Sequence, residues 1–469
     1  MKLERLLLHN FRCFRHLAID FNDDLTVIVA ENGAGKTAVL DAIAIGFGRY
    51  LTKLPGIAGI AIRDGDVRIE RDERPAHFMM IGWKARTREG ASVEWAAGRR
   101  NMASPRILRV SRELEGEYQE TLKKGMKQID DFTNQLIEAE AGGQAYFLPV
   151  IAYYGTSRAA RDEVQRRRGF RKQFSRFEAL AGALEPDSSF RKAFEWFNAM
   201  EDQERREQQA RRDFDYRLPE LQTVRAAIVR MLGAEFSNPR TEIRPLRFVI
   251  DRAAGNGEVQ TLRVAQLSDG YRAVLGLVMD LARRMTQANS HLVPGGNLIM
   301  NPLDLPAIAL IDEVDLHLHP SWQQRVLTDL MRTFTKTQFI VTTHSPQVLS
   351  NVGASGIRVL RQAIDPETGQ RDSVIERVST QTLGVSSADL LARVMNVDPV
   401  PLVPEAEMLS EYQGLIQQNQ HETPEGKAMR VRLNEHFGAD HPVMRECDRL
   451  IRLQGFKQRL PRIPRNTEG

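Results

Sequence analysis

Short, unbroken apolar runs alternate along the chain with longer stretches whose apolar residues recur at helical spacing. Residues 25–29 (LTVIV), 308–311 (IALI) and 339–342 (FIVT) are the clearest runs. Such runs are typical of strands that are buried on both faces of a parallel sheet. Further strands are predicted at residues 2–8, 17–21, 67–70, 77–84, 92–95, 147–154, 242–250, 258–264, 357–360 and 373–378, and helices at residues 38–47, 117–141, 218–232, 271–284 and 320–334.

Two parts of the chain carry helical patterns almost alone. One is the mixed-charge stretch at residues 158–234, and the other is residues 386–469, where helices at 405–418, 425–437 and 442–460 follow a Pro-rich connector. Strands that alternate with helices elsewhere predict an α/β fold. The predicted organisation is two α/β lobes separated by an inserted helical lobe and followed by a helical C-terminal domain: residues 1–157, 158–234, 235–385 and 386–469.

The overall charge of the chain permits a polyanionic partner without requiring one. The 469 residues have a formal net charge of +4, and 42% of them are hydrophobic, which is sufficient for a sizeable core. Residues 157–176 contain eight Lys or Arg against only Asp162 and Glu163. Such a run is either a solvated helix face or a nucleic-acid contact, and the solvated face is the commoner case.

Composition also indicates where the protein works. Cys13 and Cys447 are the only cysteines, and neither has a metal-type or CxxC spacing, which indicates a reducing cytoplasm. The N-terminus has a three-residue leucine run followed by Arg12, which does not resemble a signal peptide. No apolar run approaches the roughly 20 residues of a membrane span, so no membrane partner is expected.

The first candidate site follows the apolar run at 25–29. Strand, loop and helix meet there in the order that phosphate-binding loops require, and the loop reads Ala30-Glu31-Asn32-Gly33-Ala34-Gly35 before Lys36 and Thr37. The glycines let the backbone turn so that successive N–H groups face a phosphate, and the following helix N-terminus favours an anion. Lys36 can then reach the β- and γ-phosphates, and the Thr37 hydroxyl can hold Mg²⁺. The P-loop pattern has Gly where this chain has Ala30, and alanine fits there if its φ is negative.

A second candidate site follows the run at 308–311. That buried strand delivers Asp312 and Glu313 to its carboxyl end, where open α/β sheets bind ligands. Asp312 is placed to hold Mg²⁺, as the Walker B aspartate does in P-loop NTPases. Glu313 is placed to act as general base on an attacking water.

Two further elements can contribute to the same site. His344 follows the strand at 339–342, about thirty residues beyond the acids, and can bind the γ-phosphate or position water. Ser268, Asp269 and Gly270 open the helix at 271–284, so that a second helix N-terminus is available to a phosphate. Taken alone, the first is usually a structural histidine and the second an ordinary helix cap.

In their order and spacing these elements resemble an ABC-type ATPase of the SMC/RecF group. Residues 30–37 resemble Walker A, residues 308–313 Walker B and residues 314–319 the D-loop. The stretch at 267–272 (LSDGYR) resembles the signature motif, and His344 resembles the switch histidine. The long interval between Walker A and Walker B, filled by a helical insertion, is typical of the group, whereas GTPases and P-loop kinases fit poorly.

The resemblance implies a RecF-like ATPase head that uses ATP and Mg²⁺. It also implies a homodimer or higher homo-oligomer, in which Ser268, Asp269 and Gly270 of one protomer face the nucleotide of the other. Residues 10–12 resemble an early "NFR" motif whose arginine, here Arg12, reaches the nucleotide phosphates. Two features depart from the pattern: His319 stands where many members carry Asp, and no Gln follows the strand at 147–154. Both bear on the rate of hydrolysis more than on binding.

Two short sequence stretches indicate the subfamily. Residues 153–158 (YYGTSR) and 312–320 resemble the ATPase subunits of Septu-type anti-phage systems and their retron-linked relatives, which work beside a separate HNH nuclease. The resemblance implies an ATP-hydrolysing defence subunit that controls a partner nuclease through its nucleotide state. Residues 449–465 hold six Lys or Arg and no acid, so this end can bind nucleic acid or an acidic partner.

Two other functions fit the same motifs. One is a RecF-like DNA-repair ATPase that clamps DNA, which predicts ATP-stimulated DNA binding without a nuclease partner. The other is a nucleotide-sensing scaffold with little or no hydrolysis. Turnover of the pure protein distinguishes the scaffold from the two ATPase interpretations.

Overall fold

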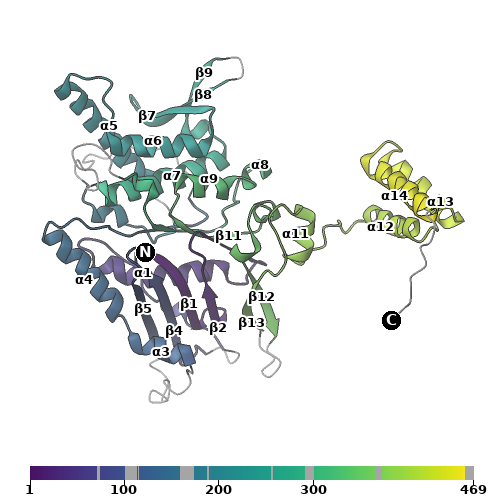
Figure 1. Cartoon of the computed structure of the whole chain (residues 1–469), viewed down its shortest axis with the longest axis horizontal. Helices are drawn as coiled ribbons and strands as arrows, with labels where there is room; N and C mark the ends of the chain where they lie inside the picture. The colour runs from purple at the N-terminus through teal and green to yellow at the C-terminus, as the bar shows by residue number, and fades with distance from the viewer. Residues whose placement is uncertain are drawn as a thin grey trace, which may run out of the picture. The chain divides into compact units, whose positions relative to one another are not determined.

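The computed structural model describes residues 1–70, 74–100, 114, 116–158, 174–186, 190–254, 257–290, 300–364 and 371–459. The chain divides into two compact units, Met1–Leu390 and Leu391–Gly469. Figure 1 shows the elements of each unit. The finer division of the first unit into two α/β lobes and an inserted lobe remains a prediction. Most of the basic run at 157–176 and the last residues of the basic tail lie outside the described residues.

The centre of the first unit is a six-stranded sheet in the order β13-β12-β3-β11-β10-β6. All its neighbouring pairs are parallel except β12 with β13. Its core strands are buried along their whole length, which explains their unbroken apolar runs. The carboxyl ends of β3, β11, β10 and β6 therefore meet at one edge. The strands are β3 (Leu25–Ala30), β6 (Val150–Tyr154), β10 (Ala307–Ile311), β11 (Gln338–Thr343), β12 (Ile357–Ile364) and β13 (Arg371–Arg377).

A second, antiparallel sheet has the order β2-β1-β4-β5. Helix α1 (Lys36–Lys53) packs between the two sheets. Its Gly46 lies against the indole of Trp83, where an added Cβ would come within 2.4 Å of the ring. The strands are β1 (Lys2–Phe11), β2 (Phe14–Asp20), β4 (Phe78–Arg86) and β5 (Ser92–Arg100), and the helices α3 (Gly116–Lys124) and α4 (Lys127–Ala141) pack against β5.

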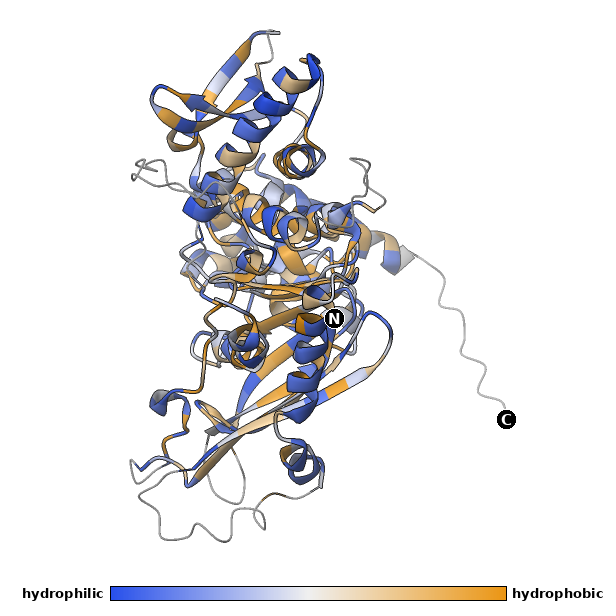
Figure 2. Ribbon diagram, turned by 90° about the vertical axis from the view of Figure 1, so that its left-hand side faces the viewer, coloured by the Kyte–Doolittle hydropathy of each residue, from blue (hydrophilic) through white to orange (hydrophobic). Residues whose placement is uncertain are grey.

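The remainder of the first unit lies beyond the opposite face of the central sheet, above it in Figure 1. Helix α7 (Asp269–Ala288) is buried along most of its length and packs against α5 (Phe190–Arg211), α6 (Pro219–Leu232) and β6. A three-stranded antiparallel sheet follows α6, with the strands β7 (Phe236–Ile243), β8 (Leu246–Ala253) and β9 (Val259–Arg263). Shorter helices complete the unit: α8 (Pro320–Gln323), α9 (Val326–Thr333), α10 (Pro346–Leu349) and α11 (Ser387–Arg393), which crosses the boundary between the units. Figure 2 shows hydrophobic residues concentrated on the central strands.

The second unit is built mainly from three helices, α12 (Pro404–Gln417), α13 (Pro424–Phe437) and α14 (Pro442–Arg459). These bounds agree closely with the helices predicted at its end. Its small core is formed by Tyr412, Ile416, Leu433, Met444 and Cys447. Among the described residues, no helix is both long and apolar enough to cross a membrane.

Two predicted helices are each interrupted. The charged stretch at 117–141 forms α3 and α4, because Gly125 between them adopts φ +54°, a left-handed conformation that ends a helix. The stretch at 320–334 forms α8 and α9 with a break near Gln324, which nothing in the local sequence marks.

Two predicted strands also differ. The stretch at 242–250 is the end of β7 and the beginning of β8, joined through Arg244 and Pro245, since proline has no N–H to donate to a ladder. The stretch at 67–70 forms only single bridges, from Val67 to Phe11 and from Ile69 to Pro75.

Helix α7 contains a buried ion cluster. Asp280 accepts hydrogen bonds from Arg283 at 2.7 Å, from Arg284 at 2.6 Å and from the Tyr154 hydroxyl at 3.1 Å. Burial alone would raise the pKa of Asp280, but the two arginines outweigh it and lower the pKa to about 2. Through Tyr154, the cluster joins α7 to β6 of the central sheet.

Replacing Asp280 by alanine is expected to lower the free energy of unfolding at pH 7 by about 3–5 kcal/mol, because two buried guanidinium groups lose their carboxylate. Urea denaturation measures this loss. As a control, Glu207→Ala removes a partly exposed i,i+4 ion pair with Arg211. It should lower the free energy of unfolding by less than about 0.5 kcal/mol. A loss below about 1 kcal/mol for Asp280→Ala would contradict the assignment.

The same variant has a definite pH dependence. Because the folded pKa of Asp280 lies below the unfolded value, its ionised form stabilises the fold fully above about pH 4. That contribution is lost as the pH falls toward 2. The difference in stability between the unaltered chain and Asp280→Ala should therefore shrink below about pH 4.

Candidate functional site

The predicted phosphate loop follows β3 directly. Ala30 is the last residue of the strand. It does not have a positive φ, so alanine fits there without strain. Gly33 and Gly35 adopt φ +80° and +102°, conformations that a side chain would disfavour. A Cβ on Gly35 would also lie 2.5 Å from the Cys13 sulfur. The turn between β1 and β2 therefore packs against the loop and closes one side of it.

Lys36 begins α1 and points back into this loop. Its ammonium donates hydrogen bonds to the carbonyls of Ala30 at 3.0 Å and Glu31 at 3.2 Å, and the residue is 7% exposed. Burial lowers the pKa of Lys36, and the carboxylates that follow β10 oppose the shift. The cation is therefore held at the centre of the loop, where backbone N–H groups and a helix N-terminus also favour an anion.

Asp312 and Thr37 meet across the edge of the sheet. The Thr37 hydroxyl donates to Asp312 Oδ2 at 2.8 Å, and the Thr342 hydroxyl donates to Oδ1 at 2.6 Å. Asp312 is only 5% exposed, yet no cationic side chain in the described part of the chain forms an ion pair with it. A buried carboxylate beside a hydroxyl, with no ion pair to another described residue, has the oxygen ligands that Mg²⁺ prefers.

Glu313 lies beside Asp312 in an unusual backbone conformation. Its φ is +47°, a region that residues with a side chain seldom adopt. Its N–H donates to the Thr342 hydroxyl at 2.7 Å. Its carboxylate makes no hydrogen bond or ion pair to any other described residue, so it is available to a ligand or water at the strand ends.

The sequence did not predict that Arg158 is buried beside the candidate site. It belongs to the basic run at 157–176, which was assigned to a solvated face or a nucleic-acid contact, but it is only 3% exposed. It donates to the carbonyls of Gly155 at 3.0 Å, Asp312 at 2.5 Å and Glu313 at 2.5 Å. Burial lowers the pKa of Arg158 to about 10. The interpretation of the run as a surface is therefore wrong for this residue.

His344 lies at the same edge of the sheet, directly after β11. It follows Thr343, the last residue of β11, whose hydroxyl donates to Asp315 at 2.5 Å. Its imidazole makes no hydrogen bond to the rest of the described chain. The structure thus places it one strand away from the P-loop and one strand away from Asp312.

The predicted signature residues lie at the start of α7. Ser268 occupies the N-cap of α7 without a side-chain cap bond, and Asp269 forms an ion pair with Arg272. A Cβ on Gly270 would lie 2.8 Å from the carbonyl oxygen of His317, so α7 begins directly on the predicted D-loop. No hydrogen bond joins residues 268–270 to residues 30–37 in the part of the chain that the structure describes.

The structure places four other predicted residues as follows. Arg12 forms ion pairs with Asp41 of α1 at 2.5 Å and with Asp66 at 2.9 Å, so two carboxylates share its charge beside the loop. His319 caps the short helix α8 by accepting from the N–H of Ser321. Asn32 and Ala34 lie within the loop itself, with Asn32 exposed and Ala34 buried.

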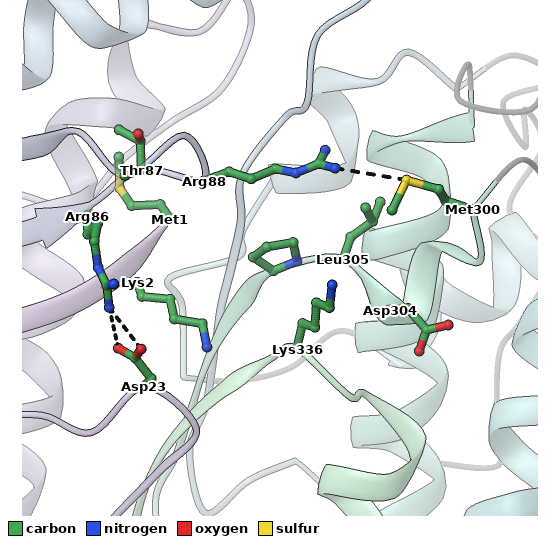
Figure 3. A pocket seen from close by; sticks show the side chains of 12 residues that line it. Met1, Lys2, Asp23, Arg86, Thr87, Arg88, Met300, Asp304, Leu305 and Lys336 are labelled. Atoms are coloured by element: carbon green, nitrogen blue, oxygen red, sulfur yellow. Dashed lines mark hydrogen bonds and ion pairs between the residues drawn. The ribbon is translucent and has the colours of Figure 1, made fainter.

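A pocket of about 350 Å³ lies at the other end of the same strands (Figure 3). It is lined by residues that precede the strands, among them Asp23 before β3, Pro306 before β10 and Lys336 before β11. Strand β10 has five residues, about 16 Å at the usual rise. Since parallel sheets bind ligands at their carboxyl ends, this pocket does not coincide with the candidate nucleotide site.

The fold and the edge cluster define an α/β P-loop ATPase. An AAA domain family matches residues 5–229, and a second family, described as "AAA domain, putative AbiEii toxin, Type IV TA system", matches residues 156–350. The chain is therefore an ATPase with the expected α/β fold.

Two similar proteins align with nearly the whole chain, and a third with about three quarters of it. The Retron Ec83 probable ATPase of Escherichia coli is 27% identical over 95% of this chain and 86% of its own length. The Retron Vc95 probable ATPase of Vibrio cholerae is 24% identical over 93% and 88%. The Septu protein PtuA of Bacillus mycoides is 22% identical over 76% of this chain and 40% of its own. Retron ATPases and Septu PtuA are thus homologues of the chain.

The SMC head domain from Thermotoga maritima covers 81% of this chain and 100% of its own length, with 16% identity and a TM-score of 0.39.

Proposed function

We propose that this chain is the ATP-binding and hydrolysing subunit of an anti-phage defence complex, and that its nucleotide state controls a partner HNH-type nuclease. The observation that carries the proposal is the cluster of Lys36, Thr37, Asp312 and Glu313 at one sheet edge, in a homologue of retron ATPases. The names of those homologues support the defence assignment, and the contacts at the edge support the chemistry.

Each residue at this edge has a separate role in hydrolysis. The backbone N–H groups of the loop and the Lys36 ammonium hold the β- and γ-phosphates. Thr37 and Asp312 would hold Mg²⁺, which neutralises phosphate charge when bound. Glu313 takes a proton from water as the water oxygen attacks the γ-phosphorus, and the bond to the bridging oxygen of ADP breaks. His344 is free to contact the γ-phosphate or to orient that water.

The site is proposed to be completed by a second copy of the chain. Ser268 and Asp269 are exposed at the N-terminus of α7, and the Ser268 hydroxyl is not used as a cap. In a homodimer these residues and Gly270 would face the triphosphate bound to the partner. The contact of Gly270 with the carbonyl of His317 supports a link between this helix start and the residues after Glu313.

The partner nuclease is proposed to bind the helical C-terminal unit. Helix α14 exposes Leu453 by 47% and Phe456 by 64%. The same helix carries Arg449, Arg452 and Lys457. Apolar side chains flanked by cations suit a partner with an apolar patch that is bordered by acids.

Changing Leu453 and Phe456 together to serine is expected to abolish co-purification with an HNH nuclease encoded beside the chain, because it removes the apolar centre of the contact. ATP binding should be unchanged. Deleting residues 398–469 should have the same effect. As a matched control, Ile243→Ser alters a side chain of the first unit that is 60% exposed and should leave co-purification intact. Full recovery of the nuclease with both changed forms would show that it binds elsewhere, with residues 158–234 the next candidate.

A further inference from the structure

Arg158, which lies just after β6, is hydrogen-bonded to the backbone of the two acidic residues that follow β10. Strand β6 ends at Tyr154, and four residues later the Arg158 side chain reaches the residues that follow β10. Its guanidinium donates to the carbonyl oxygens of Asp312 and Glu313, both at 2.5 Å, and to that of Gly155 at 3.0 Å. A planar guanidinium can bind two adjacent carbonyls at once, which a lysine ammonium cannot do with the same geometry.

These contacts fix the backbone of Glu313 from both sides. Its N–H donates to the Thr342 hydroxyl at 2.7 Å, and its carbonyl accepts from Arg158. Between those two bonds the residue holds φ +47°, which a residue with a Cβ keeps only where its surroundings enforce it. The Glu313 side chain itself has no hydrogen bond to another described residue. The backbone conformation therefore decides where its Cα–Cβ bond points.

We propose that Arg158 is a positioning residue for hydrolysis, which holds Glu313 in the backbone conformation that aims its carboxylate at the attacking water. This inference rests on the proposed role of Glu313 as general base. Arg158 contacts no phosphate in the proposal and acts only through the carbonyls of Asp312 and Glu313. Without it, the Glu313 peptide can relax toward negative φ and the carboxylate moves away from the water. A displacement of about 1 Å at a reacting group can reduce the rate by about 10²-fold.

Steady-state ATP hydrolysis by Arg158→Met and Arg158→Lys tests the proposal. The methionine variant should lose about 10²-fold in kcat, while its KM for ATP changes by less than about 3-fold. The lysine variant should retain an intermediate kcat, because an ammonium can hold one carbonyl at a time. Arg176→Lys is the matched control: Arg176 also binds backbone carbonyls, those of Ala288 and Tyr146, but away from the strand ends. Its kcat should stay near that of the unaltered chain.

A double-mutant cycle separates positioning from general damage to the fold. In a Glu313→Gln background, Arg158→Met should change kcat by less than about 3-fold, because the group that it positions is already inactive. An equal 10²-fold loss in both backgrounds, or a rise in KM with kcat unchanged, would overturn the proposal. If Arg158→Met does not fold, Arg158→Lys carries the same comparison. If Glu313→Gln alone leaves kcat unchanged, the assignment of the general base fails instead.

Discussion

The Glu313→Gln variant is expected to bind ATP as tightly as the unaltered chain and to hydrolyse it about 10²–10⁴-fold more slowly. An amide has nearly the same shape as a carboxylate but cannot accept the proton from water. Because the Glu313 side chain makes no hydrogen bond to another described residue, the exchange breaks none of the contacts that hold the site together. Phosphate release measures turnover, and equilibrium titration with ATP measures binding.

The same variant tests the proposed dimer. Because bound ATP persists, the nucleotide-dependent dimer should accumulate, and light scattering at micromolar protein with ATP and Mg²⁺ should report at least two chains. Glu207→Gln, on the surface of α5, serves as the control and should turn over normally. Loss of ATP binding by Glu313→Gln would contradict the assigned role, and a monomer under these conditions would contradict the shared site.

Lys36→Ala is expected to abolish ATP binding at concentrations that saturate the unaltered chain. The side chain is the cation at the centre of the loop, 7% exposed and hydrogen-bonded to the carbonyls of Ala30 and Glu31. A hydrogen bond to a charged group contributes up to about 3 kcal/mol, which corresponds to about 10²-fold in affinity. Hydrolysis should fall with binding, in contrast to Glu313→Gln.

A second lysine on the same helix provides the control for that result. Lys53 lies at the end of α1 and forms an ion pair with Asp130, far along the helix from the loop. Lys53→Ala should leave ATP affinity unchanged, as measured by the same titration. Equal loss of affinity in both lysine variants would show that the helix, and not the charge at the loop, determines binding.

Sequence patterns predicted most of the residues of the candidate site because the proposed chemistry is local. The glycines, Lys36 and Thr37 are contiguous, so their spacing alone predicts a loop before a helix. Asp312 and Glu313 directly follow an apolar run, and a buried strand must end where its polar residues begin. That β3 and β10 end at the same edge also follows from the parallel arrangement that such runs predict.

The pairings between distant segments were not predictable in the same way. Arg158 and Asp312 are 154 positions apart, and a basic run has the same composition whether its arginines face solvent or a buried carbonyl. The Thr342 hydroxyl, which binds both Asp312 and the N–H of Glu313, belongs to a β-branched residue that any strand would accept. Such contacts leave no periodic signal.

By itself, then, the sequence determined which residues are candidates for a triphosphate site and which strands precede them, because charge, glycine placement and apolar runs act over a few residues. Only the tertiary structure decided how those residues are held. The left-handed backbone of Glu313, its support by Arg158 and Thr342, and the packing of Gly270 on His317 each depend on segments that approach one another only after the sheet has assembled. Hydrogen bonds and close packing act over a few ångströms in space, whatever the separation along the chain.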